Sequence, residues 1–398
     1  MSNSTEAVTM TWTTPKNLQD LATPALLLDR DIMQANLKRM ADRIGALRCS
    51  MRPHVKTHKS LDVLRDVQAA GETVGITVST LHEADYFLSG GHKDILYAVG
   101  MTPNKVAVAK GLIHRGCALT LITDNAPMAA LLNERARAEE IELPVLIELD
   151  VDGHRSGVDP HGDELIHLAH TIHDAEGLVL KGVMTHAGGS YDCSSLDAVQ
   201  AHARQERDFT VAAANRLRAE GLPCPVVSVG STPTAMTTEN LDGVTEIRPG
   251  VYTFLDLFQA GLGVAEIKDI AVSVLTTVIG HQADKGWVIV DAGWMAMSRD
   301  RGTAQQNIDQ GYGLVCDVAG KPLGDVVMRG ANQEHGILVA RDSGRRIARA
   351  DFPVGTLLRI LPNHACATAS QYGAYIVLEE EKPSFVWGRI NGWSGDWA

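Results

Sequence analysis

The sequence Arg52-Pro-His-Val-Lys56-Thr-His-Lys59 places a lysine directly after a short strand-like run and between two histidines. A lysine amine becomes nucleophilic when burial or neighbouring cations lower its pKa, and Arg52, His54, His58 and Lys59 are candidate cations. The pattern therefore favours Lys56 as a lysine that forms a Schiff base. The alternative interpretation is an ordinary basic loop at the end of a strand, because lysine and histidine are common surface residues.

Strand-like runs alternate with helical segments on both sides of this sequence. Helical spacing of apolar residues covers 33–44, 61–70 and 127–140. The strand-like runs are 24–29, 52–55, 75–80, 94–99, 119–123, 144–151, 182–186, 226–229 and 244–248. Such alternation predicts an α/β fold with a parallel sheet, and the length favours a closed (β/α)8 barrel. Because these runs outnumber the strands of that barrel by one, we expect one of them to lie outside it.

From about residue 268 the pattern changes to short β-like runs joined by turns. These runs are 271–280, 287–291, 325–328, 336–339, 356–361 and 375–379. We therefore predict a barrel domain over residues 22–265 and a mostly β domain over residues 266–398. Residues 1–21 are polar and are expected to pack with the second domain.

Composition narrows the class of function. A formal net charge of −12 opposes non-specific binding to nucleic acid or to anionic membranes. The six cysteines are scattered without a C-x-x-C pair, which is typical of a reducing compartment. Residues 1–20 contain no apolar core of a secretory signal, and no stretch of about 18 apolar residues suggests a membrane span. We expect a cytoplasmic protein that acts on a small molecule.

In such a barrel, active sites form at the carboxyl ends of the strands, and unusual residues follow several of the predicted strands. The segments are Lys56, 152–157, 186–191, 230–234 and 248–252. Among them Gly230-Ser231-Thr232-Pro233 combines small residues, hydroxyls and a helix start, which suits a phosphate group. An ordinary helix cap has the same composition. A Schiff-base lysine together with a phosphate site on a barrel suggests pyridoxal phosphate.

A second signal lies in the β domain, at Asn363-His364-Ala365-Cys366. If this segment is an extended strand, alternate residues point the same way, so His364 and Cys366 share one face. Imidazole and thiolate are ligands suited to zinc. By contrast His167, His170 and His173 have helical spacing but lie away from the strand ends, and we expect them on a solvated helix surface.

These segments together resemble the pyridoxal-phosphate barrel of the alanine racemase type and, over the whole chain, the D-serine dehydratase and D-threonine aldolase group. The stretches that carry the resemblance are 52–56, 152–158, 185–191, 226–234, 280–304, 330–338 and 358–368. The resemblance implies that Lys56 holds the cofactor, that Arg155 lies near its ring hydroxyl and that His186 packs on its ring. It implies that Tyr191 neighbours the pyridine nitrogen. It further implies a phosphate site made of Gly230, Ser231, Thr232, Gly250 and Tyr252.

The same resemblance places a divalent metal, either zinc or manganese or cobalt, at His364 and Cys366. Aldolases of this group commonly have His-x-Asp there, so Cys366 favours elimination of water over carbon–carbon cleavage. The expected enzyme is a lyase that converts a D-3-hydroxy amino acid to a 2-oxo acid and ammonia. D-threo-3-hydroxyaspartate is the first choice of substrate and D-serine the second. The alternatives are a D-threonine aldolase activity and a non-catalytic pyridoxal-phosphate carrier.

Four further residues are candidates for binding substrate. Gln333 and His335 lie in a stretch shared with the family, although a plain turn is the alternative. Arg299 and Arg301 follow a β-domain strand and are candidates to pair with a second substrate carboxylate, although each is also suited to a surface ion pair. The resemblance also suggests a head-to-tail homodimer in which one β domain closes over the other barrel.

Overall fold

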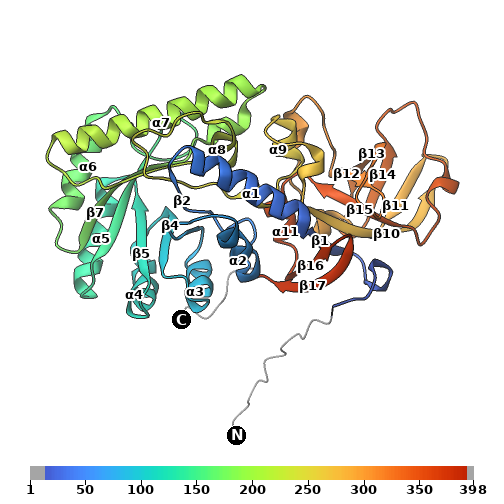
Figure 1. The fold of residues 1–398 in the computed structure, drawn as a ribbon, viewed down its shortest axis with the longest axis horizontal. Coiled ribbons are helices and arrows are strands. Elements are labelled where there is room, and N and C mark those ends of the chain that lie inside the picture. The colour runs from blue at the N-terminus through green and yellow to red at the C-terminus, as the bar shows by residue number, and fades with distance from the viewer. Residues whose placement is uncertain (1–13, 392–398) are drawn as a thin grey trace, which may run out of the picture.

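The computed structural model describes residues 14–391, which form two halves joined side by side (Figure 1). The first half contains a parallel eight-stranded sheet in the order β2-β9-β8-β7-β6-β5-β4-β3. Its strands are β2 (Ser50–Met51), β3 (Ile76–Val78), β4 (Asp94–Gly100), β5 (Ala118–Thr123), β6 (Leu143–Leu149), β7 (Leu178–Thr185), β8 (Val226–Val229) and β9 (Glu246–Ile247). Isolated parallel bridges of Met51 with Thr73 and of His54 with Thr77 join its two edges, so the sheet curls into the predicted barrel.

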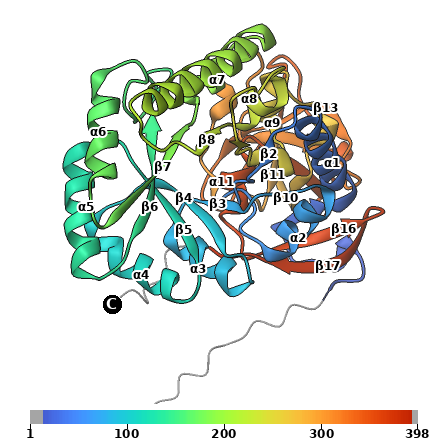
Figure 2. The same ribbon diagram turned by 60° about the vertical axis from the view of Figure 1, so that its left-hand side comes forward.

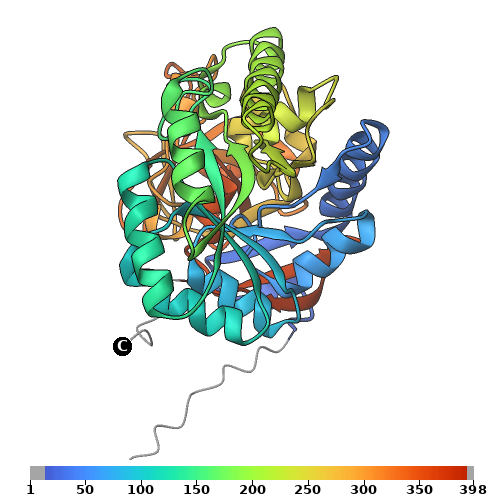
Figure 3. The ribbon, with the colours of Figure 1, turned by 90° about the vertical axis from the view of Figure 1, so that its left-hand side faces the viewer.

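Helices surround this sheet, as Figures 2 and 3 show. The short helix α9 (Leu257–Gly261) lies apart from them, toward the β domain (Figure 1). The helices around the sheet are α1 (Arg30–Ala46), α2 (Leu61–Ala70), α3 (Leu81–Ser89), α4 (Val106–His114), α5 (Ala126–Ala138), α6 (Asp163–His173), α7 (Leu196–Ala219) and α8 (Thr232–Thr237). Their apolar faces explain the arrangement, because α2 buries Val63, Leu64 and Val67 at helical spacing. None of the described helices is both long enough and apolar enough to span a bilayer.

The second half is a nine-stranded, mostly antiparallel sheet in the order β11-β14-β13-β12-β15-β10-β1-β16-β17. Its strands are β1 (Ala25–Asp29), β10 (Val272–Gln282), β11 (Trp287–Val290), β12 (Gly313–Cys316), β13 (Pro322–Ala331), β14 (Gly336–Ala340), β15 (Leu357–Pro362), β16 (Ala374–Glu379) and β17 (Lys382–Gly388). Because β11 also pairs with β10, six of these strands form a closed ring, from which β1, β16 and β17 extend. Two short helices, α10 (Trp294–Met297) and α11 (Ala365–Ala369), interrupt the loops.

Strand β1 corrects the predicted domain boundary. We placed residues 24–29 within the barrel domain, but β1 pairs antiparallel with β10 and parallel with β16. Leu26, Leu27 and Leu28 are all almost fully buried, as expected for a strand covered on both faces. Leu18 packs with Leu27 in the same apolar cluster, so the described part of the N-terminal segment also joins the β domain. The strand-like run that lies outside the barrel is therefore 24–29.

Candidate active site

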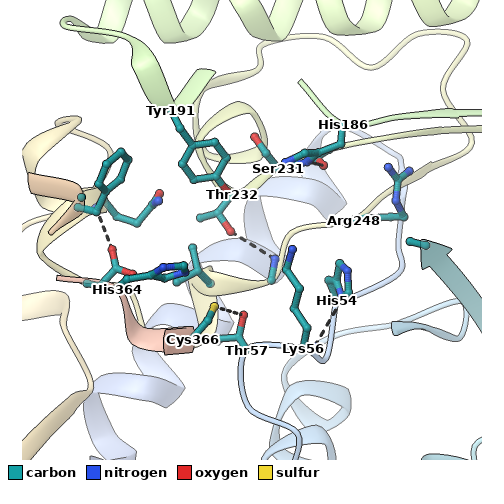
Figure 4. Close-up of a pocket in the computed structure, with 18 of the residues that line it drawn as sticks. His54, Lys56, Thr57, His186, Tyr191, Ser231, Thr232, Arg248, His364 and Cys366 are labelled. Carbon is teal, nitrogen blue, oxygen red and sulfur yellow. Dashed lines mark hydrogen bonds between the residues drawn. The ribbon is translucent and has the colours of Figure 1, made fainter. Parts of the chain in front are cut away.

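A cavity of about 340 Å³ lies between the barrel and the β domain of a single chain. One wall, the barrel wall, consists of residues at the carboxyl ends of barrel strands; the other, the β-domain wall, carries residues around α11 and the segment 300–302 (Figure 4). The barrel wall includes His54, Lys56, Thr57, Arg155, His186, Tyr191, Gly230, Ser231, Thr232, Arg248 and Gly250. The β-domain wall includes Asp300, Gly302, His364 and Cys366, with Asp256, Phe258 and Gln259 between the two walls.

Lys56 extends into the cavity from a backbone that is held on both sides. The amide of His54 donates to Pro249 O at 2.9 Å, and the amide of Val55 donates to Thr77 O at 2.9 Å. Within residues 14–391 the Lys56 amine has no hydrogen bond or ion pair. Lys59 differs, because its amine pairs with the buried Glu83 carboxylate at 3.1 Å. The arrangement favours Lys56 over Lys59 as the reactive amine.

The cationic neighbours expected around Lys56 are largely absent from the described structure. Arg52 forms ion pairs with Asp94 at 2.7 Å and Glu246 at 2.8 Å. His58 is fully buried, and burial, followed by the charge of Arg389, lowers its pKa to about 3. Burial also lowers the pKa of His54 well below its usual value, with Lys56 as the next cause. These side chains are paired or neutral.

Arg248 is the cation that the sequence analysis did not assign. It is buried in the barrel wall, one residue after β9, and donates to the Ser228 hydroxyl and Thr185 O. Its charge contributes to the lowered pKa of His54. The available signal was its position immediately after the last barrel strand, a place where functional residues collect in this fold.

His186 follows β7 and is a neutral imidazole. Its Nδ1 atom lies 3.2 Å from Gly230 O, and because a carbonyl only accepts, Nδ1 carries the proton. Burial, followed by the charge of Lys56, lowers its pKa to about 3. Tyr191 lies 6.0 Å from His186 between ring centroids, and burial raises the pKa of its phenol. In Figure 4 the Tyr191 ring extends toward Thr232.

The predicted phosphate site is a tight turn between β8 and α8. Gly230 has a φ of +130°, and a Cβ there would lie 2.7 Å from the Arg248 amide nitrogen, so only glycine fits. Ser231 caps α8 by accepting from the Thr234 amide at 3.2 Å. The Thr232 hydroxyl accepts from the amides of Gly250 at 3.3 Å and Tyr252 at 3.1 Å. Tyr252, predicted as part of this site, is buried and does not line the cavity; its amide reaches the site only through Thr232.

Glu206, on α7, ties this turn to the segment that carries His186. Its Oε1 atom accepts from the amides of Ala187 at 3.1 Å and Gly230 at 3.0 Å, and burial raises the pKa of the carboxyl. Arg155 stands at the cavity edge, where it pairs with Glu148 at 3.1 Å. An unpaired amine, a neutral imidazole and a turn of small hydroxyl residues suit a phosphorylated pyridine aldehyde.

The β-domain wall carries the predicted metal pair, although not on a strand. Strand β15 ends at Pro362, His364 caps α11, and Cys366 lies in its first turn. The expectation of an extended His-x-Cys was therefore wrong, because the chain turns into a helix here. Both side chains nonetheless line the cavity, and the Cys366 sulfur lies 3.3 Å from the Thr57 hydroxyl oxygen (Figure 4).

The His364–Cys366 pair is strongly coupled to carboxylates that the sequence analysis missed. His364 Nδ1 lies 2.7 Å from an Asp300 carboxylate oxygen. Burial lowers the pKa of His364, but the charge of Cys366 and the hydrogen bond to Asp300 outweigh it and raise the value to about 11. Burial opposes ionisation of Cys366 in turn, yet His364 brings the pKa of that thiol below its usual value. Imidazole and thiolate at one site suit a zinc-like cation.

Asp256 is the second missed carboxylate. It is buried, and burial raises its pKa, while its two oxygens accept from the amides of Gln259 and Ala365, each at 2.9 Å. It therefore fixes the start of α11. Within residues 14–391 no cluster of three or more histidine, cysteine or acidic side chains is arranged to hold a metal. Catalytic zinc sites usually have three protein ligands and one open position, so this pair would leave an additional position to water or substrate.

The four candidate substrate residues do not line this cavity. Gln333 and His335 are exposed in the turn between β13 and β14, and Arg299 is exposed with its guanidinium 5.0 Å from the Trp294 ring centre. Arg301 pairs with Asp309 at 3.0 Å, as the alternative interpretation for that residue expected. A second set of predictions is confirmed: His167, His170 and His173 are exposed on α6.

Comparison with known proteins gives the same division of the chain. The family model "Alanine racemase, N-terminal domain" matches residues 28–257, and "Putative serine dehydratase domain" matches residues 271–378. The chain is 53% identical to D-threo-3-hydroxyaspartate dehydratase from Delftia sp. (strain HT23), covering 94% of this chain and 99% of that protein. It is 29% identical to D-serine dehydratase from Dictyostelium discoideum, covering 92% and 95%.

Solved structures of similar proteins have the same fold. The Delftia enzyme superposes with a TM-score of 0.92 at 52% identity, covering 95% of this chain and 100% of that one. A structure of a D-threo-3-hydroxyaspartate dehydratase with a cysteine replaced by alanine, in a metal-free form, gives a TM-score of 0.93 at 52% identity, covering 95% of this chain and 100% of that one. D-threonine aldolase from Filomicrobium marinum gives a TM-score of 0.79 at 26% identity, covering 95% and 97%. Alanine racemase from Bacillus anthracis, at 15% identity and a TM-score of 0.67 over 93% and 98%, shares the fold.

Proposed function

Since the chain belongs to the family that joins an alanine racemase N-terminal domain to a serine dehydratase domain, we propose that it is a pyridoxal-phosphate and metal dependent lyase. It removes water from a D-3-hydroxy amino acid and yields a 2-oxo acid and ammonia. D-threo-3-hydroxyaspartate is the first substrate and D-serine the second. The observation that carries the proposal is that Lys56 and the His364–Cys366 pair line one cavity of one chain.

In this mechanism the barrel wall holds the cofactor. Lys56 would bind it covalently, Ser231, Thr232 and the segment at Gly250 would hold its phosphate, and His186 would cover its ring. The cofactor supplies an electron sink for the substrate α carbon. Because His186 is neutral and its Nδ1 proton is engaged by Gly230 O, it would cover the ring without adding charge.

Lys56 is also the base of this mechanism. The free amine of Lys56 would take the substrate Cα proton, because Lys56 is the lysine among the described lining residues. His364 and Cys366 would hold the metal, which would supply Lewis acidity toward the 3-hydroxyl. Phe258, Met184 and Val251 line the cavity with apolar surface, which limits access of water to the reacting atoms.

The competing functions differ in their products and in what they need from the β domain. A D-threonine aldolase would yield glycine and an aldehyde, and Cys366, at a position where aldolases of this group commonly have aspartate, favours elimination. A non-catalytic carrier would need the barrel wall alone. The coupled Asp300–His364–Cys366 set facing Lys56 across the cavity argues against that role.

We also propose a cytoplasmic homodimer. Arg299, Gln333 and His335 are exposed on the β domain and lie outside the cavity of their own chain. A head-to-tail partner would allow these side chains to reach the barrel of the other subunit, where Arg299 would pair with the second carboxylate of hydroxyaspartate. An unpaired carboxylate in a partly desolvated site is costly, so this contact would favour the dicarboxylic substrate.

The test of the proposed function is an assay of D-serine, D-threonine and both D-3-hydroxyaspartates, with and without a chelator. Release of ammonia and a 2-oxo acid, fastest with D-threo-3-hydroxyaspartate and lost with the chelator, is the expected result. Glycine and an aldehyde as products would establish the aldolase instead. Cofactor binding without conversion of any of the four compounds would favour the carrier.

A further inference from the structure

We infer that Asp300 is the positioning residue of the metal site: its carboxylate accepts the Nδ1 proton of His364 and thereby directs the Nε2 atom to the metal. The inference deepens the proposed function, on which it rests. Its basis is the 2.7 Å contact between His364 Nδ1 and Asp300, which joins residues 64 positions apart in the chain. Metal-binding histidines depend on such a partner, because it fixes the tautomer and the ring orientation.

The Asp300 carboxylate is itself fixed. One oxygen faces His364, and the other accepts from the Gly302 amide at 2.8 Å. The Asp300 amide donates to the Ser298 hydroxyl at 3.2 Å. Because both carboxylate oxygens and the amide are engaged, the side chain presents one oxygen to His364 in a set direction.

Asn363, the residue before His364, joins the turn that carries His364 to the turn that carries Asp300. The Asn363 amide group donates to Asp300 O at 3.2 Å and to Gly311 O at 2.7 Å, and its oxygen accepts from the Thr303 hydroxyl at 3.0 Å. Asn363 is almost fully buried, so these contacts are shielded from water. The two turns therefore hold the imidazole and the carboxylate at a fixed separation.

The tautomer follows from the acceptor. With a carboxylate oxygen at Nδ1, the proton of a metal-binding imidazole stays on Nδ1, and the lone pair is on Nε2. His364 and Cys366 both line the cavity, so an imidazole whose Nδ1 is engaged by Asp300 leaves Nε2 as its free ligand atom. Asp256, the other nearby carboxylate, has both oxygens on backbone amides and does not replace Asp300.

The chain contains a matched control in Asp309. Like Asp300, it accepts from the amide of the glycine two residues later, Gly311, at 2.8 Å. Its other partners are Arg301 at 3.0 Å and Arg329 at 3.8 Å rather than a histidine. Replacing either aspartate removes the same kind of turn contact, but only the Asp300 change affects a metal-binding imidazole.

The experiment measures zinc affinity of the cofactor-loaded protein by competition with a chromophoric chelator. We expect Asp300→Ala to bind zinc about 10 to 100 times more weakly than the unmodified chain, the usual cost of losing a partner of a metal-binding histidine. The zinc affinity of Asp300→Asn should lie between that of Asp300→Ala and that of the unmodified chain, because the amide oxygen still accepts a hydrogen bond but carries no charge. Asp309→Ala should bind zinc like the unmodified chain, and all variants should retain the absorbance band of the lysine-bound cofactor.

A second measurement separates positioning from direct ligation. With cobalt in place of zinc, Asp300→Asn should keep the absorption spectrum of the unmodified protein at saturating metal, since the ligands are unchanged. A changed cobalt spectrum would make Asp300 a ligand and overturn the inference. Zinc affinity of Asp300→Ala within twofold of the unmodified chain would also overturn it while leaving the proposed function intact. An unmodified protein without zinc affinity would overturn both.

Discussion

The two walls of the cavity keep their histidines in opposite protonation states. In the barrel wall burial lowers the pKa of His186 to about 3, with Lys56 as the next cause, and the imidazole is neutral. In the β-domain wall burial acts in the same direction on His364, but Cys366 and Asp300 raise its pKa to about 11. Burial alone therefore produces a neutral face for a cofactor ring, whereas burial beside two anions produces a site for positive charge. A metal at His364 replaces that proton.

The largest test of the barrel wall is Lys56→Ala. We expect it to abolish turnover and the absorbance band of the lysine-bound cofactor, because no other described lysine lines the cavity. Lys59→Ala is the matched control: its amine pairs with Glu83, so the variant should lose stability but keep the band. Retention of the band in Lys56→Ala would show that another amine holds the cofactor.

Metal removal is the corresponding test of the β-domain wall. Dialysis against a chelator should abolish water elimination while the cofactor band remains, because His364 and Cys366 lie away from the Ser231–Thr232 turn (Figure 4). Activity should return on addition of zinc, manganese or cobalt. Full turnover by protein shown to be free of metal would leave the β-domain wall without its proposed role.

The sequence predicted the barrel wall better than the β-domain wall. Lys56, His186 and Ser231 each follow a barrel strand, and a parallel barrel brings all such positions to one end, so periodicity was enough to group them. The run at 24–29 has the same local pattern as the barrel strands. Its partners β10 and β16 lie far along the chain, and local pattern carries no information about them.

The β-domain wall was predicted only in part, because long-range contacts determine it. The resemblance to a family identified the His364–Cys366 pair as metal ligands. The prediction that the pair lies on a strand was wrong, because helix α11 begins there. Its first amide, that of Ala365, donates to Asp256, 109 residues earlier in the chain. Asp300 was missed since nothing near it in sequence indicates His364. Arg299 and Arg301 were chosen from the same segment, where the aspartate between them is the residue that lines the cavity.

Mixed dimers test whether the two walls of one site belong to one chain. Lys56 and His364 line the same cavity, so co-expression of Lys56→Ala with His364→Ala should restore no activity. Lys56→Ala with Arg299→Ala should differ, because the proposed dimer brings Arg299 from the partner subunit. Random pairing would then restore about a quarter of the unmodified activity on hydroxyaspartate. Restoration by the first pair would show that the metal ligands act across the interface.

Acid stability tests the neutral histidines of the barrel. His58 is fully buried, and burial followed by the charge of Arg389 lowers its pKa to about 3. In the unfolded chain the pKa of histidine is about 6.5. Between these two values the unfolded chain binds a proton at His58 and the folded chain does not. The contribution of neutral His58 to the free energy of unfolding is therefore complete above about pH 6.5. It is lost as the pH falls below that value, by about 1.4 kcal/mol per pH unit. His58→Asn should show a shallower fall of the free energy of urea unfolding between pH 6.5 and 4. Parallel pH profiles for the two proteins would mean that His58 is protonated in the fold.

The smallest expected effect concerns the contact that joins the two walls. Thr57, next to Lys56, is fully buried, and its hydroxyl lies 3.3 Å from the Cys366 sulfur. Thr57→Val keeps the shape of the side chain but removes the hydroxyl, and Cys366→Ala removes the sulfur. A double-mutant cycle on the metal-free protein isolates the pair, because each single change also perturbs packing and these costs cancel in the cycle. We expect a coupling energy of about 1 kcal/mol by urea unfolding, typical of one buried hydrogen bond. Thr57→Ser should retain most of this coupling energy, since the hydroxyl remains as a partner for the Cys366 sulfur. Additive effects of Thr57→Val and Cys366→Ala would show that the walls meet without this bond and are aligned by the domain interface alone.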